Sequence, residues 1–464
     1  MKQEIKTFLE MAKSATAWRQ NKEIKELLTI DGIDYAKALD YLLLVKLKLP
    51  SFNEKFYNDK NKKVFSLFFP KPKPNPSEIL IFLDSDLRIA QYLPILNELA
   101  KRKISCTLAT SVLTIWKTMK SRGFKCIFIK EKKENVNEIT NKVKEILKDK
   151  KYFYKETDLN PIIINSLEWI PSLLGYQTEI KRILKEAKPK SILIECDSTP
   201  QGAIVMALAE KLGVKSFVLQ HGVSSAEPPT GFFPILAGKL FVWEKDLMEM
   251  AKELKTESKT ISVGNPLFQI DVSETSKIKK RLGISDTDKV VLVTLSQYLG
   301  KNNKLYEEKL IELFNSLSKL EKTKIIMKFH PLDNLSYYSK FKEKFPDIIY
   351  TRTPSLKTLF DKRMHTSNMI DLIKISNVMI GHASTSLLES WAMSKPAIEY
   401  DIFKDGIGRI TDLEGKNTEE VINIVKKCLL MNQIQITKLK SAVTKRYLFE
   451  SEDAAKEIVD LLIE

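Results

Sequence analysis

From residue 78 onward, short apolar runs alternate with stretches whose apolar residues recur at helical spacing. Runs that are apolar throughout and alternate with helices are typical of parallel sheets covered by helices on both faces. One sheet of eleven strands is unusual, so we expect two sheets that meet near residues 264–266. The predicted strands are residues 78–83, 105–109, 125–129, 191–195, 216–220, 240–243, 259–263, 289–295, 324–329, 377–380 and 396–400. The predicted helices include residues 88–101, 201–212, 305–320 and 385–393.

The pattern changes before residue 76. Residues 2–17 and 35–47 are predicted to be helical, and four prolines between residues 70 and 76 exclude helix and inner strand there. We therefore expect a helical extension and linker (residues 1–75), a first Rossmann-like domain (76–270), a second (271–435) and C-terminal helices (436–464) that cross back to the first domain. The extension either docks the protein near a membrane-bound acceptor or packs on the first domain.

The formal net charge is +16, from 75 Lys and Arg against 59 Asp and Glu. Lysines are spread along the chain without an arginine-rich arm, which disfavours nucleic-acid binding. The charge could instead attract an anionic donor or a membrane surface, or reflect a lysine-rich composition. No apolar run reaches the ~20 residues of a membrane span, and residues 1–20 lack the apolar core of a secretory signal. We expect a cytoplasmic protein, either free or peripheral on the inner face of the membrane.

The four histidines fall within residues 221–382, and three of them end predicted strands. These three are His221, His330 and His382, whereas His365 lies in a polar segment and is expected at the surface. Open α/β sheets bind ligands at the carboxyl ends of their strands. The placement therefore predicts phosphate and hydroxyl chemistry.

The first site is Gln220-His221-Gly222, followed by a polar, proline-containing loop over residues 223–233. A neutral imidazole there could act as general base on an acceptor hydroxyl or bind a sugar or phosphate oxygen. The alternative is a histidine that only caps the strand.

The second site is His330-Pro331, where proline stops the strand. His330 is a candidate phosphate ligand. Lys328 would share its face in a regular strand, and could add charge or simply be solvated.

The third site begins at Gly381 and places Ser384, Thr385 and Ser386 at the start of a helix. Free N–H groups, the helix dipole and hydroxyls together favour a phosphate, although one hydroxyl would suffice as an ordinary cap. Glu389, further along, could reach a ribose hydroxyl or only favour the helix dipole.

Asp84 and Asp86 lie in the loop after the first predicted strand. Either could act as base or bind the acceptor, or merely cap the next helix. Their spacing also matches a metal-binding aspartate pair, but we expect no metal site because such a pair normally follows a nucleotide-binding domain.

These motifs, in this order, resemble the GT-B glycosyltransferase superfamily over about residues 78–400. More narrowly, the chain is similar to surface and capsular polysaccharide transferases and to CDP-glycerol glycerophosphotransferases. The resemblance implies an α/β fold of two doubly wound Rossmann-like domains facing a central cleft, the first holding the acceptor and the second the nucleotide. It implies a nucleotide-sugar donor, a glycan or lipid-linked acceptor, and no required metal or other cofactor.

The resemblance also assigns roles. The donor phosphates would be bound by the second domain and Glu389 would bind the ribose, while His221 would lie beside the reacting atom. The donor-binding set is His330, Pro331, Gly381, Ser384, Thr385, Ser386, Glu389 and Ser296. Further cleft residues are Gln220, Gly222, Asp197 and Asn265.

The sequence departs from the motifs of two related enzyme families that catalyse other reactions. UDP-N-acetylglucosamine 2-epimerases carry Thr-x-His-Arg-x-Glu where residues 294–299 here lack His and Arg. Glycerophosphotransferases usually show Trp before His-Gly, where Gln220 stands, and Tyr-Ser-Ser at the third site. Sugar transfer is therefore preferred, with polyol-phosphate transfer, epimerisation, a non-catalytic nucleotide-sugar-binding module and a nucleic-acid binder as alternatives.

Overall fold

The computed structural model describes residues 2–48, 75–85, 88–130, 132–223, 231–269, 275–294, 303–329, 339–352, 365–367, 369–382, 384–402 and 411–464. The chain divides into two compact units. Unit 1 comprises Met1–His221, Glu227–Gly264 and Ala454–Glu464. Unit 2 comprises Gly222–Ala226 and Asn265–Asp453.

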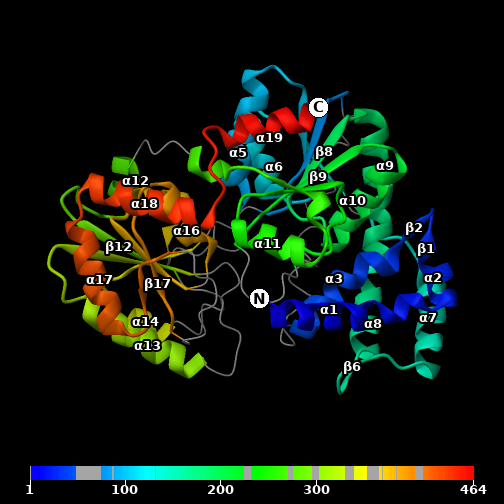
Figure 1. The fold of residues 1–464 in the computed structure, drawn as a ribbon, viewed down its shortest axis with the longest axis horizontal. Coiled ribbons are helices and arrows are strands. Elements are labelled where there is room, and N and C mark those ends of the chain that lie inside the picture. Colours follow the sequence, from blue (N-terminus) through cyan, green and yellow to red (C-terminus); the bar gives the residue numbers. More distant parts are fainter. Residues whose placement is uncertain are drawn as a thin grey trace. The chain divides into compact units, whose positions relative to one another are not determined.

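Unit 1 is built on a seven-stranded sheet in the order β11-β10-β9-β8-β3-β4-β5, with every pairing parallel (Figure 1). Its central strands are apolar and fully buried, because helices cover both faces. All seven strands coincide with predicted apolar runs to within a residue or two. They are β3 (Ile79–Phe82), β4 (Cys106–Thr110), β5 (Cys126–Phe128), β8 (Ser191–Ile194), β9 (Lys215–Leu219), β10 (Lys239–Val242) and β11 (Thr260–Ser262).

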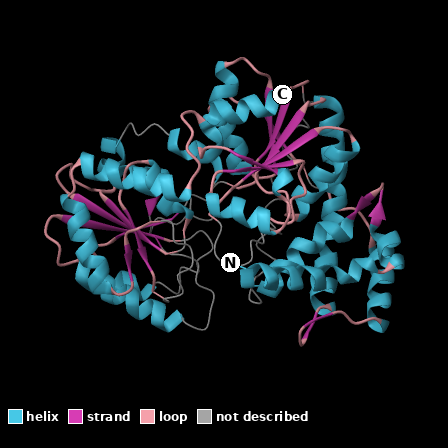
Figure 2. Cartoon of the chain, in the orientation of Figure 1, coloured by secondary structure: helices cyan, strands magenta, loops and turns pink. Residues whose placement is uncertain are grey.

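Helices lie between most of these strands along the chain (Figure 2). The helix α10 begins after Thr199, whose side chain accepts a hydrogen bond from the Gly202 N–H, and Pro200 supplies a favourable first residue. The connecting elements are α5 (Ile89–Lys101), α6 (Leu113–Ser121), α7 (Asn137–Asp149), β6 (Phe153–Tyr154), β7 (Thr157–Asp158), α8 (Asn160–Ser166), η4 (Leu167–Trp169), α9 (Ile170–Ala187), α10 (Pro200–Lys211), α11 (Lys245–Glu253) and η5 (Glu257–Lys259).

The N-terminal region is part of unit 1. Its apolar run lies on α3, where Leu42, Leu43 and Leu44 are buried and the helix packs against α8 and α10. Arg19 and the buried Asp40 form an ion pair of 3.1 Å inside this region. The apolar face of α3 is thus covered by protein. The elements are α1 (Lys2–Ala17), η1 (Trp18–Gln20), α2 (Lys22–Leu28), β1 (Thr29–Ile30), β2 (Ile33–Asp34) and α3 (Tyr35–Lys48).

The last helix, α19 (Ala454–Ile463), also belongs to unit 1, where it packs on α5 and β8 (Figure 1). Its buried face includes Ile458, Val459 and Leu462. Arg102, next to α5, forms ion pairs with Glu98 and with Asp460 of α19.

Unit 2 contains a second seven-stranded parallel sheet in the order β15-β14-β13-β12-β16-β17-β18. Four of its strands were predicted, whereas the inner strand β14 and the two short edge strands β15 and β18 were not. The strands are β12 (Lys289–Thr294), β13 (Thr323–Lys328), β14 (Ile349–Arg352), β15 (His365–Thr366), β16 (Val378–Gly381), β17 (Ala397–Tyr400) and β18 (Glu414–Gly415). The α/β fold class with two Rossmann-like sheets is confirmed.

Two helical layers enclose this second sheet (Figure 2). One layer, with α13 and α17, closes a core that includes Phe314, Phe329 and Val425. The helices are η6 (Pro266–Gln269), α12 (Thr275–Arg281), α13 (Asn303–Leu317), α14 (Ser339–Lys344), α15 (Met369–Ile375), α16 (Thr385–Ala392), α17 (Thr418–Leu430) and α18 (Gln433–Tyr447). Across the described ranges of both units, no helix combines the length and apolarity needed to cross a bilayer.

Candidate functional site

In unit 1, three titratable side chains follow the carboxyl ends of three neighbouring strands. Asp84 follows β3, Glu195 follows β8 and His221 follows β9. The pairing register aligns Phe82 of β3 with Ile194 of β8, so the segments that carry Asp84 and Glu195 leave the sheet side by side. Because all three strands are parallel, these groups gather at one edge, where α/β sheets bind ligands.

His221 is half-buried and its ring lies against Phe232, with the ring centroids 4.6 Å apart. Gly231 leaves room for the ring, since a Cβ there would lie 3.3 Å from the imidazole Nε2. Burial lowers the pKa of His221 to about 3, and the positive charge of Arg88 adds to this effect. The imidazole is therefore neutral at physiological pH. A hydrogen bond with the Glu195 backbone partly offsets the lowering of the pKa.

Glu195 is a residue that the sequence analysis did not select. Its two carboxyl oxygens accept hydrogen bonds from the backbone N–H groups of Asp84 (3.0 Å) and Ser85 (3.2 Å). Burial, then the negative charge of Asp84, raises the pKa of Glu195 to about 8, and Arg88 partly offsets the rise. A carboxylate that ends an otherwise apolar inner strand is the signal that could have identified it.

Asp84 holds two strand ends together. Its Oδ1 accepts hydrogen bonds from the Thr110 hydroxyl (3.1 Å) and the Ser111 N–H (2.6 Å), both at the end of β4. The structure therefore shows Asp84 in a bridging position. Asp86 lies outside the described residues.

Asp197 is buried and accepts hydrogen bonds from the N–H groups of Leu236 (2.7 Å) and Ala237 (2.8 Å). Burial raises the pKa of Asp197 to about 6, and these two bonds partly counter the rise. The neighbouring Ser198 hydroxyl donates to the Gly231 carbonyl at 3.3 Å. This turn after β8 thus fixes the segment that carries Phe232 against His221.

Gln220 is fully buried and ties β9 to the end of β10. Its Oε1 accepts from the Trp243 N–H (3.0 Å) and the Glu244 N–H (3.2 Å), and its Nε2 donates to the Glu244 carboxylate (2.8 Å). The Gln220 carbonyl accepts a hydrogen bond from Gln91 of α5 at 2.7 Å. Gln220 therefore positions the backbone that presents His221.

In unit 2, β16 ends at Gly381 beside the start of α16. A Cβ at Gly381 would lie 2.8 Å from the Thr294 hydroxyl and 3.1 Å from Leu387, so this close approach of backbone and helix requires glycine. Ser384 caps α16: its Oγ accepts from the Ser386 N–H at 3.3 Å and lies 2.7 Å from the Ser386 Oγ. Strand, glycine and hydroxyl-bearing helix start therefore form one compact turn.

Thr385 and Glu389 complete this turn. The Thr385 Oγ1 accepts a hydrogen bond from the Val223 N–H at 3.3 Å, and a Cβ on the buried Gly222 would lie 3.1 Å from the same oxygen. The short segment that holds Gly222 belongs to unit 2. Glu389 is half-buried one turn further along α16.

Other polar groups of unit 2 have structural contacts. The His382 Nδ1 lies 3.2 Å from the buried Glu399 carboxylate on β17. Lys328 is buried and donates to the Ser367 carbonyl at 3.1 Å, and burial lowers the pKa of Lys328 to about 7. Lys328 is thus inside the fold, so the solvated alternative for it is wrong.

The structure also locates one further predicted cleft residue and one predicted surface residue. Asn265 is buried, and its Oδ1 accepts from the Leu267 N–H at 3.0 Å, which caps η6. His365 is exposed on the edge strand β15. His330, Pro331 and Ser296 lie outside the described residues. Among the described residues, no group of three or more His, Cys, Asp or Glu side chains is arranged to hold a metal ion.

No family model matches the chain, and no curated protein matches its sequence. Solved structures do match. UDP-N-acetylglucosamine 2-epimerase from Neisseria meningitidis, bound to UDP-GlcNAc, has a TM-score of 0.53 at 14% identity and covers 83% of this chain and 99% of its own. A glycosyltransferase from Rickettsia africae has a TM-score of 0.51 at 13% identity, over 84% of this chain and 98% of its own.

The wall teichoic acid polymerase TagF has a TM-score of 0.51 at 12% identity, over 92% of this chain and 96% of its own. The chain has the GT-B fold. Within the GT-B fold, the turn between β16 and α16 lies in the second Rossmann-like unit, and the Glu195 and His221 edge lies in the first. Identities this low establish the shared fold, and the reaction must be argued from the residues.

Proposed function

We propose that the protein is a glycosyltransferase that moves a sugar from a nucleotide-sugar donor to a hydroxyl of a glycan or lipid-linked acceptor. The reaction would serve the biosynthesis of surface polysaccharide or another glycoconjugate, at the cytoplasmic side of the membrane. The observation that carries the proposal is the turn from Gly381 to Ser386, on a GT-B fold whose solved members include a UDP-GlcNAc-bound enzyme.

The donor side is assigned to unit 2. The first N–H groups of α16 have no partner within the helix, and the dipole gives this end partial positive charge. The hydroxyls of Ser384, Thr385 and Ser386 lie at the same end, so a diphosphate has donors there without a metal ion. We assign His330 and Ser296 to the phosphates as well, and Glu389 to the ribose.

The acceptor side is assigned to the Glu195 and His221 edge of unit 1. A neutral imidazole can accept a hydrogen bond from a sugar hydroxyl, which fits His221. Its low pKa makes it a weak proton acceptor, whereas the pKa of Glu195, about 8, lies close to physiological pH. We therefore propose that His221 orients the acceptor hydroxyl and that Glu195 takes up the proton.

The reaction is then a displacement at the anomeric carbon. The acceptor oxygen forms the new bond to this carbon as its proton passes to Glu195. The bond from the anomeric carbon to the diphosphate oxygen breaks, and the nucleoside diphosphate leaves with the electron pair. Helix-end N–H groups and hydroxyls stabilise the charge that develops on the leaving group.

A panel of nucleotide sugars, tested for protection of the purified protein against thermal unfolding, examines the donor assignment. A donor at about 100 times its dissociation constant stabilises by about 2.7 kcal/mol. We expect one class of nucleotide sugar to raise the melting temperature by several degrees, and His330→Ala to lose most of this shift. No shift with any nucleotide sugar, or a shift with CDP-glycerol alone, would overturn sugar transfer.

A further inference from the structure

The two most exposed large apolar side chains among the described residues lie at one corner of unit 2. Leu430, the last residue of α17, is 86% exposed, and Ile434, in the first turn of α18, is 80% exposed. They are four positions apart in sequence, so their Cα atoms lie within about 14 Å of each other. The next most exposed large apolar side chain, Phe153, is 52% exposed and lies in unit 1.

Lysines surround these two residues. Residues 421–447 contain six Lys or Arg and no Asp or Glu. Lys426 and Lys427 precede Leu430 by four and three positions, and Lys438 follows Ile434 by four, so each shares a helix face with an exposed apolar side chain. These three lysines are exposed and form no ion pair with described residues.

Few carboxylates lie near these lysines in sequence. Glu420 precedes Lys426 by six positions on the same helix, which corresponds to about 9 Å along the axis. This separation is close to the Debye length of about 8 Å at physiological salt, so Glu420 neutralises Lys426 only in part.

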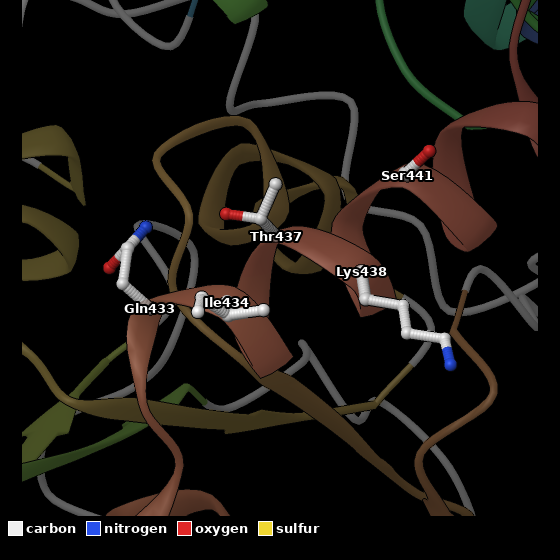
Figure 3. Close-up of a pocket in the computed structure, with 5 residues that line it drawn as sticks. All are labelled: Gln433, Ile434, Thr437, Lys438 and Ser441. Atoms are coloured by element: carbon white, nitrogen blue, oxygen red, sulfur yellow. The ribbon is translucent and has the colours of Figure 1, made fainter.

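Figure 3 shows the face of α18 at this corner. Gln433, Ile434, Thr437, Lys438 and Ser441 line a shallow, open hollow with mainly aliphatic walls, and the Lys438 side chain extends away from the helix. Such a surface has no depth for a small ligand but suits a flat partner.

We propose that the α17–α18 corner, formed by Lys426, Lys427, Leu430, Ile434 and Lys438, docks on an anionic lipid bilayer. Leu430 and Ile434 insert between headgroups and the lysines lie over lipid phosphates, as in an interfacial amphipathic surface. A second copy of the chain is disfavoured because a two-fold contact would bring six lysines together. Nucleic acid is disfavoured because the corner has no aromatic side chain for base stacking. The proposal does not depend on the transferase assignment.

The test is flotation of the full chain with phosphatidylcholine vesicles, with and without phosphatidylglycerol. We expect binding only with the anionic lipid, weakened by salt. Leu430→Glu combined with Ile434→Glu should weaken binding at least tenfold. Replacing the three lysines by Gln should weaken it about a hundredfold. Equal binding to neutral vesicles, or none to either, would overturn the proposal.

The matched control is Leu212→Glu combined with Ile463→Glu, which changes the net charge equally at exposed apolar positions of unit 1. This control should bind vesicles like the wild type, and an equal loss would contradict the corner as the docking surface. Light scattering measures the oligomeric state of the wild type and of Leu430→Glu. A wild-type dimer that Leu430→Glu converts to a monomer would show that a second copy occupies the corner instead.

Discussion

At the scale of single residues, Glu195 and His221 follow the ends of two neighbouring strands, and their pKa values are shifted in opposite directions. Burial disfavours the charged form of each group, so it raises the pKa of the carboxyl to about 8 and lowers that of the imidazole to about 3. Opposed shifts in neighbouring groups often accompany acid–base roles. The two side chains can therefore be separated by their pH dependence.

If Glu195 takes up the acceptor proton, kcat/KM should rise with pH to a plateau above about 8, because only the carboxylate form is a base. Glu195→Gln should lose about 10² to 10⁴ in rate and lose this rising limb. A pH–rate profile measured between pH 6 and 9 is the check. Glu210→Gln, on the exposed face of α10, should keep both rate and profile. A flat wild-type profile would exclude Glu195 as the base.

Asp197 is expected to support the site through stability. Asp197→Ala leaves the N–H groups of Leu236 and Ala237 without an acceptor, at about 1–3 kcal/mol each, while Asp197→Asn keeps an acceptor oxygen. Urea unfolding should show a much larger loss for Ala than for Asn. Similar losses for both variants would show that the carboxylate charge, and not the acceptor, is what the fold needs.

The pKa of Asp197 also fixes the sign of a pH effect. Its value is raised from 3.8 to about 6 on folding, so the folded state binds the proton more tightly than the unfolded chain. Its contribution to the free energy of unfolding should therefore fall as pH rises from about 4 to 6. Asp197→Asn should remove this dependence, which urea midpoints across that range would reveal.

At the scale of elements, the sequence predicted the apolar strands of both sheets and missed β14 and the two-residue edge strands β15 and β18 of unit 2. Inner strands such as β3 and β12 are apolar on both faces and give continuous runs. The strands β15 and β18 have two residues each, His-Thr and Glu-Gly, and carry no apolar signal. The same limit applies to the site. Three strand-end histidines could be seen in sequence, whereas the partners of Glu195 and Asp197 depend on turns that periodicity does not describe.

The start of α16 offers a prediction at this scale. Thr385→Asp adds negative charge at a helix N-terminus, which favours the helix by about 0.3–1 kcal/mol but repels a phosphate. We expect nucleotide-sugar binding by calorimetry to fall at least tenfold without loss of melting temperature. Thr275→Asp makes the same change at the first residue of α12 and should leave binding intact. Unchanged binding in Thr385→Asp would remove this turn as the phosphate site.

At the scale of the whole molecule, both ends of the chain belong to unit 1. The N-terminal helices and α19 both belong to unit 1, so the first and last residues of the chain stabilise the same unit. The chain passes from unit 2 directly into α19 after Asp453. The buried face of α19 packs on α5 and β8 of unit 1.

Ile458→Ala should therefore destabilise unit 1 by about 2–5 kcal/mol, since Ile458 is fully buried in α19. Ile463→Ala, 44% exposed on the same helix, should cost little. Hydrogen exchange read separately for the two sheets is the measurement. Faster exchange in β12 and β13 with none in β3 and β8 would contradict the assignment of α19 to unit 1.

The identity of the nucleotide released from the donor tests the central claim most directly. Incubation with a nucleotide-sugar panel and CDP-glycerol, in the presence of membrane-derived acceptor, should release a nucleoside diphosphate as labelled sugar enters the acceptor. Release of CMP from CDP-glycerol would indicate polyol-phosphate transfer, and conversion of UDP-GlcNAc to its 2-epimer without transfer would indicate an epimerase. Either result, or no nucleotide released from any donor, would contradict glycosyl transfer.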